Sequence, residues 1–255
     1  VAVVIGDGME GFKGLARHLV PSLLVLCMVS LGAPCAAQEN VDAPTVPTAP
    51  DVGDGRGSLF APSAWLVLST PVHRKVDLKL YGFFIGNLEV PVAQLDVPIR
   101  AARFLTVTPS YMYYSAPPSG LNELSPQPGR FTDSYEEHQF RVDGTVSFAV
   151  RKFEISARNM YVRRFRPAPA ADMNRYRGRV QVAHPVAVDG RIWKPFAAYE
   201  TFYERPAGWN RERVWTGVTL PLKKNVFIQP SYLWETSDGG RPIHYAMFGL
   251  IVNTR

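Results

Sequence analysis

A two-residue alternation of polar and apolar side chains runs through most of the chain and constrains the fold more than any other feature. In residues 174–188 (NRYRGRVQVAHPVAV), one set of alternate positions begins with three arginines, whereas the other set is rich in valine. Successive side chains of a β-strand point to opposite faces of the sheet. This stretch therefore predicts a long strand with one charged face and one apolar face.

The same period recurs along the chain after residue 58, where no stretch has the 3.6-residue period of an amphipathic helix. The predicted strands are 64–70, 75–85, 90–99, 104–114, 136–150, 152–164, 174–188, 191–204, 210–222, 225–236 and 243–252. The segments 64–70 and 90–99 are the weakest, because proline is disfavoured within a sheet. The pattern predicts an all-β chain.

The connections between these segments differ in length. The short ones lie at Arg151, Asp189-Gly190 and Lys223-Lys224, and the longer ones at 115–135, 165–173, 205–209 and 237–242. Short turns at one end and longer loops at the other are typical of outer-membrane barrels, which in bacteria have even strand numbers. We therefore expect an antiparallel up-and-down transmembrane β-barrel of about 10 strands, within a range of about 8 to 12.

The Asp189-Gly190 dipeptide is a favoured two-residue hairpin turn, so it predicts a register. If these residues form the loop, Arg179 falls opposite Glu200 and Arg175 falls opposite Glu204. Opposite charges directly across a pair of strands stabilise it, so we expect the polar face to line the lumen as a charge network. The predicted members are Arg141, Asp143, Arg175, Arg177, Arg179, Glu200, Glu204, Arg211, Arg213, Glu235 and His244.

Aromatic residues bear on whether this barrel crosses a membrane. A soluble barrel would show the same alternation with its apolar face inside. When the chain is traced up and down, however, Tyr and Trp gather near the longer loops, as they do at a membrane–water interface. The predicted aromatic girdle is Tyr113, Tyr176, Tyr203, Trp209, Trp234 and Tyr245.

The N-terminal region has the features of a targeting segment. Residues 1–37 contain two basic residues, an apolar stretch at 19–31 and small residues before a cleavage site, which predicts a signal peptide. Residues 1–8 are expected to lie upstream of the true start. Residues 38–58 are rich in Pro, Gly and Asp and predict a disordered leader, so residues 59–255 are expected to form the barrel. Both cysteines precede residue 38, which suits passage through an oxidising periplasm.

Several stretches of the predicted strands resemble a known family. They are EEHQFRVDG (136–144), SARNMYVRRF (156–165), NRYRGRVQV (174–182), PFAAYETFYE (195–204), WNRERVWTGVTLPL (209–222) and FIQPSYLWE (227–235). Their arginine-bearing strand starts, Tyr-Glu strand and Asn-Arg before an aromatic–Gly strand resemble the domain-of-unknown-function 2490 family. The resemblance covers roughly residues 60–252. It implies a small outer-membrane β-barrel of a Gram-negative bacterium, with no assigned activity and no catalytic residues to carry over.

The residues predict no catalytic, cofactor-binding or metal site. His244 and Glu235 are expected to face each other in the lumen as a simple contact, with Ser231 placed deeper. No His/Cys/Asp cluster has the spacing of metal ligands. The net charge is +6, but the arginines are interleaved with apolar residues, which argues against nucleic acid. Small anions are the ligands that an arginine face would suit.

The expected location is the outer membrane, with its lipid and the barrel-assembly machinery as partners. We expect an undefined role there, either structural or as a narrow channel, because side chains nearly fill a barrel of eight strands. One alternative is a surface enzyme acting on lipid or lipopolysaccharide. The other is a soluble, lipocalin-like periplasmic ligand carrier.

Overall fold

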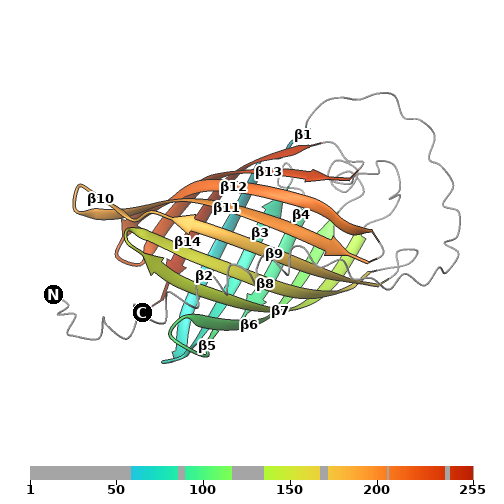
Figure 1. Cartoon of the computed structure of the whole chain (residues 1–255), viewed down its shortest axis with the longest axis horizontal. Coiled ribbons are helices and arrows are strands. Elements are labelled where there is room, and N and C mark those ends of the chain that lie inside the picture. The colour runs from blue at the N-terminus through green and yellow to red at the C-terminus, as the bar shows by residue number, and fades with distance from the viewer. Residues whose placement is uncertain are drawn as a thin grey trace, which may run out of the picture. The chain divides into compact units, whose positions relative to one another are not determined.

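A computed structural model describes residues 59–85, 90–116, 135–166, 172–205, 207–238 and 242–254, which form one antiparallel β-sheet apart from two parallel contacts (Figure 1). The strands are β1 (Leu59–Phe60), β2 (Ser63–His73), β3 (Val76–Ile85), β4 (Val90–Asp96), β5 (Ile99–Arg100), β6 (Leu105–Ala116), β7 (Tyr135–Val150), β8 (Phe153–Phe165), β9 (Met173–Ala183), β10 (Val186–Val188), β11 (Arg191–Glu204), β12 (Gly208–Lys223), β13 (Val226–Ser237) and β14 (Ile243–Asn253). None of these described residues belongs to a helix long and apolar enough to span a membrane. The predicted signal peptide and leader lie outside the described residues.

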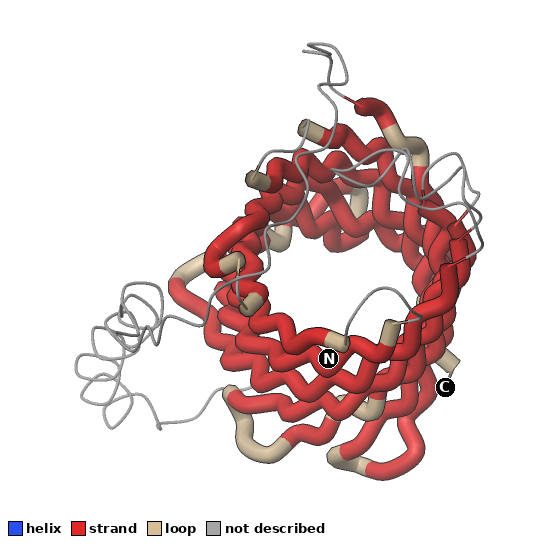
Figure 2. The backbone as a smooth tube through the Cα atoms, turned by 90° about the vertical axis from the view of Figure 1, so that its right-hand side faces the viewer, coloured by secondary structure: helices blue, strands red, loops and turns tan. Residues whose placement is uncertain are grey.

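The sheet closes into a barrel because its last long strand pairs with its first, as the end view shows (Figure 2). Eleven long strands form the wall, in the order β2, β3, β4, β6, β7, β8, β9, β11, β12, β13 and β14. Each of the predicted segments, including the two weak ones, contributes one of them. The count lies within the expected range, but it is odd. Neighbouring strands alternate in direction, so the first and last of eleven run the same way, and β14 pairs with β2 in parallel.

Prolines divide two of the predicted strands. Pro98 separates β4 from the short β5, and Pro185 separates β9 from β10. Proline has no backbone N–H to donate to the ladder, which is why the predicted segments 90–99 and 174–188 each form two shorter strands. The β10–β11 hairpin still closes as predicted and extends beyond the rim (Figure 1).

The tight turn of this hairpin sets its register. Asp189 and Gly190 have φ angles of 48° and 73°, the left-handed conformation that a two-residue hairpin turn requires. Arg179 pairs with Glu200 and Arg175 pairs with Glu204, so the predicted cross-strand register is confirmed.

The two faces of the barrel wall differ sharply in polarity. Outward-facing apolar side chains such as Phe140 and Val180 are 55% and 43% exposed. Inward-facing polar side chains such as Glu137 and Glu200 are only 0% and 5% exposed. A soluble barrel has the opposite arrangement, with an apolar interior. A closed sheet that pairs its backbone groups and has an apolar outer surface is the architecture of a transmembrane barrel.

The closing seam depends on one glycine. Gly249 of β14 pairs with Trp65 of β2, and the indole ring covers it so closely that a Cβ atom on Gly249 would lie 2.1 Å from the ring. The two parallel strands therefore meet where a small residue accommodates a large one.

Candidate functional site: the arginine wall of the lumen

The inward faces of β7, β8, β9, β11, β12 and β13 together form what we call the arginine wall. Alternation along these strands places eight arginines toward the lumen: Arg141, Arg158, Arg164, Arg175, Arg177, Arg179, Arg211 and Arg213. The same faces carry five central carboxylates: Glu137, Asp143, Glu200, Glu204 and Glu235. Arginine therefore outnumbers carboxylate along this wall.

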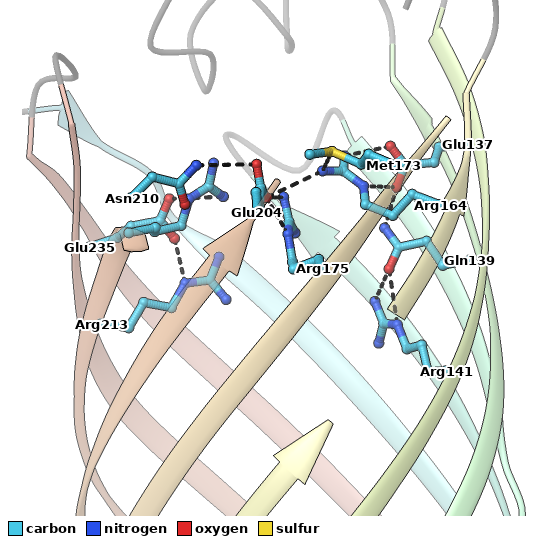
Figure 3. A network of polar contacts seen from close by, with 11 residues as sticks. Glu137, Gln139, Arg141, Arg164, Met173, Arg175, Glu204, Asn210, Arg213 and Glu235 are labelled. Atoms are coloured by element: carbon cyan, nitrogen blue, oxygen red, sulfur yellow. Dashed lines mark hydrogen bonds and ion pairs between the residues drawn. The ribbon is translucent and has the colours of Figure 1, made fainter. Parts of the chain in front are cut away.

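A chain of ion pairs links these side chains around the barrel (Figure 3). It begins on β13 at Glu235, which accepts a hydrogen bond from Arg213 Nε and lies 3.5 Å from Arg211 Nη1. On β11, Glu204 pairs with Arg175 and accepts a hydrogen bond of 3.3 Å from Asn210. These contacts join β9, β11, β12 and β13 at the height of the longer loops.

The chain continues to the other side of the wall through Arg164. Its guanidinium lies 3.6 Å from Glu204 and donates two hydrogen bonds of 2.6 Å to Glu137. Gln139 donates to Glu137 and accepts from Arg141, which also donates 2.9 Å to Gln94 of β4. The polar contacts therefore run continuously from Asn210 of β12 to Gln94 of β4. Arginine suits such a belt because its five donors serve several acceptors at once.

Deeper in the lumen, several arginines surround one carboxylate. Glu200 accepts two hydrogen bonds from Arg177 Nη2, at 2.9 and 3.1 Å, and one from Arg158 Nη2, at 2.8 Å. Arg213 Nη1 lies 3.8 Å away. Arg179 stands directly opposite Glu200 in the register, yet it donates to Gln181 and has no carboxylate within 4.0 Å among the described residues. An arginine side chain reaches diagonal neighbours, so the Cα register does not decide which one binds.

Phe202 provides an apolar support for the cations. It is 1% exposed, and its ring lies 4.7 Å from the Arg177 guanidinium carbon, 4.8 Å from that of Arg213, 5.6 Å from Arg175 and 5.7 Å from Arg211. Cation–π contacts of this kind strengthen when the partners are shielded from water. The ring thus separates four like charges and holds each of them in place.

Several members of this wall are not among the residues predicted from the sequence. Arg158, Arg164, Glu137 and Gln139 have the same strand parity as their predicted neighbours, so alternation alone identifies them as inward. Phe202 lies between Glu200 and Glu204 on the polar face of β11, and its aromatic character concealed it. A pattern of polar and apolar residues cannot predict contacts between an aromatic ring and arginine.

Two predictions on β14 are wrong. His244 faces outward, where its ring hydrogen bonds to the Tyr232 hydroxyl, and Tyr245 faces the lumen and is 8% exposed. The register explains both errors, because Glu235 pairs with Ile243 and not with His244. A slip of one residue moves every side chain of a strand to the other face.

Asp143 and the remaining aromatic residues lie on the expected faces. Asp143 faces the lumen and accepts a hydrogen bond of 3.0 Å from Thr145, although no arginine lies within 4.0 Å of it among the described residues. On the outer face, the Trp209 ring contacts Tyr203 at 5.4 Å and Tyr176 at 6.1 Å. Tyr113 also lies outside, against the His138 ring, and Trp234 pairs with His244.

Two histidines, His138 and His244, lie on the outer face of the barrel and not in the lumen. His138 shares a hydrogen bond of 2.6 Å with the Tyr111 hydroxyl on the outer face, as His244 does with Tyr232. In the described part of the chain, no three His, Cys, Asp or Glu side chains are grouped to hold a metal ion. What the lumen provides is a dense array of arginine donors, which suits anions.

Comparison with known proteins finds similar solved structures and one matching family. Among solved structures, the chain is similar to LpxR from Salmonella typhimurium, with a TM-score of 0.47 and 9% identity over 69% of this chain and 83% of that one. It is also similar to the beta domain of the Bordetella autotransporter BrkA, with a TM-score of 0.41 and 16% identity over 66% of this chain and 78% of that one. No curated protein matches the sequence. The family model described as "Protein of unknown function (DUF2490)" matches residues 85–242, so the chain belongs to the DUF2490 family.

Proposed function

We propose that the protein is a narrow outer-membrane channel whose arginine wall admits small anions. The closed sheet and its apolar outer face support a location in the outer membrane. Lipid offers no hydrogen-bond partners to the backbone, so a sheet that spans a membrane must close to pair all its N–H and C=O groups. The aromatic contacts near the longer loops suit one membrane–water interface.

The selectivity rests on one observation, the excess of arginine over carboxylate along the wall. A cleft lined by one sign of charge with low-dielectric walls concentrates counter-ions. The guanidinium groups keep part of their surface accessible in the lumen, with Arg158 and Arg213 side chains 26% and 24% exposed. An anion that enters the lumen therefore meets these groups directly.

The size of the barrel favours a narrow passage. Side chains nearly fill a barrel of about eight strands, whereas barrels of about 16 strands enclose a wide aqueous channel. Eleven strands lie between these limits, and long arginines project into the space that remains. Small ions are the solutes that such a lumen suits, in preference to sugars or peptides.

The test is conductance in planar bilayers. The purified barrel is expected to conduct, and under a salt gradient its reversal potential should show preference for chloride over potassium. Replacing Arg158 and Arg179 together by Gln should shift that potential toward zero. The matched control is Arg163→Gln, because Arg163 lies on the outer face of β8 and pairs with Asp172. A folded barrel that does not conduct, or one that prefers potassium, would overturn the proposal.

A further inference from the structure

The surroundings of Glu200 carry more positive charge than the protein itself neutralises. Arg158, Arg177 and Arg213 contact Glu200, and Arg179 stands opposite it. Glu200 is 5% exposed and is already bound by Arg177 and Arg158. Glu200 therefore faces four guanidinium groups, of which only Arg213 has a further carboxylate partner, Glu235, among the described residues.

The register makes this imbalance sharper. Arg158 of β8 pairs directly with Arg179 of β9, and both side chains face the lumen. Like charges directly across a pair of strands destabilise it. Arg158 has Glu200 as a counter-charge, whereas Arg179 donates only to the neutral amide of Gln181 among the described residues. A further anion between the two arginines would remove the repulsion.

Two residues that adjoin Arg179 also carry hydrogen-bond donors that lack acceptors. Arg158 Nε and Trp215 Nε1 are both buried and have no hydrogen-bond partner among the described residues. Trp215 lies beside Arg179, whose guanidinium carbon is 4.4 Å from the centre of the indole ring. Buried donors without acceptors are rare in native proteins and call for an explanation. A bound oxyanion would supply acceptors to both.

We infer that Arg158, Arg179 and Trp215 form a binding site for one phosphate group in the lumen. Arginine presents paired N–H donors that can bind two oxygens of a phosphate group at once. A chloride ion is spherical and has no such pair of acceptor atoms. A dianion also offsets more of the surplus charge than a carboxylate does. This site rests on the proposed function, because the channel is the route by which the anion reaches it.

The experiment is calorimetric titration of the full chain, folded in detergent, with inorganic phosphate at constant ionic strength. We expect saturable binding of one phosphate per barrel, weaker binding of sulfate and acetate, and no saturation with chloride. Arg179→Gln is expected to weaken phosphate binding roughly tenfold, as the loss of a charge-assisted hydrogen bond implies. Arg158→Gln provides a second variant, should the first fail to fold.

The control is again Arg163→Gln, which removes an arginine of the same strand from the outer face and should leave phosphate binding unchanged. Folding of every variant is checked by its migration on unboiled gels. Phosphate binding that is equal in Arg179→Gln and the unmodified protein would overturn the site, as would chloride binding of equal strength.

The site and the channel fail in different ways. A barrel that binds phosphate but does not conduct would refute the channel and keep the site. A barrel that conducts chloride and shows no saturable phosphate binding would refute the site and keep the channel.

Discussion

The arginine wall and the opposite side of the lumen are held together by different means. The opposite side is formed by β2, β3, β4 and β6, and these strands contain no arginine. Gln94 there donates 2.6 Å to Asp96 of the same strand and accepts a hydrogen bond from Arg141 of the arginine wall. In the arginine wall, Arg158 reaches Glu200 and Arg164 reaches Glu137, across 42 and 27 residues of sequence. One barrel thus combines a side in which several buried ion pairs join different strands with a side whose strands contain no arginine.

The largest expected effect comes from removing the carboxylate at the centre of the arginine wall. Glu200→Gln leaves Arg158 and Arg177 without their counter-charge and should lower the free energy of unfolding by roughly 3 kcal/mol. Asp96→Asn, on the other side, replaces a carboxylate whose described partners are the Gln94 amide and the Tyr81 hydroxyl, both uncharged, and should cost about 1 kcal/mol. Urea unfolding of both variants in the same detergent measures the difference. Equal losses would show that the two sides do not differ in this way.

A second test compares the two faces of β9. Val180→Arg places a charge on the outer face and should destabilise the barrel by about 2 kcal/mol in lipid. Gln181→Arg adds the same charge to the polar lumen and should cost less, although it also removes the oxygen that accepts a hydrogen bond from Arg179. Unfolding in lipid vesicles provides the measurement. The reverse ranking would place the apolar face inside the barrel.

The seam between β14 and β2 tests the side without arginine. Gly249→Ala brings a Cβ atom against the Trp65 ring and should cost roughly 1–3 kcal/mol through overpacking. Adding Trp65→Leu should restore much of the lost stability, because the smaller side chain leaves room for the new Cβ atom. The effects of mutations at two residues in contact are not additive. If the double variant is as unstable as the sum of the single ones, the contact does not govern the seam.

The smallest effect is expected at Arg179. Arg179→Gln removes a charge that has no carboxylate partner among the described residues and that faces Arg158. The free energy of unfolding should therefore change by less than about 1 kcal/mol, toward greater stability. Arg177→Gln is the comparison, because it removes the guanidinium group that donates to both oxygens of Glu200 and should destabilise. If Arg179→Gln lowered the free energy of unfolding as much as Arg177→Gln does, the claim that Arg179 lacks a counter-charge would be wrong.

The sequence predicts the register between β9 and β11 correctly, because Asp189-Gly190 forms a two-residue turn that determines which residues pair. The sequence between β13 and β14 does not fix a register in this way, and the predicted pairing is wrong by one residue there, which put His244 and Tyr245 on the wrong faces. The eleven predicted segments match the eleven long strands, but the parallel closure of β14 on β2 was not predictable, since alternation says nothing about how a sheet closes. The ion pairs could be predicted only as a set, because an arginine reaches several carboxylates from one backbone position.

The central claim is that the barrel spans the outer membrane with its apolar face in lipid. The most direct test separates the membranes of cells producing the protein and compares boiled with unboiled samples on a gel containing SDS. The account predicts that the protein lies in the outer-membrane fraction and migrates differently before and after boiling, as a folded barrel does. Recovery in the soluble periplasmic fraction, with the same migration in both samples, would contradict it.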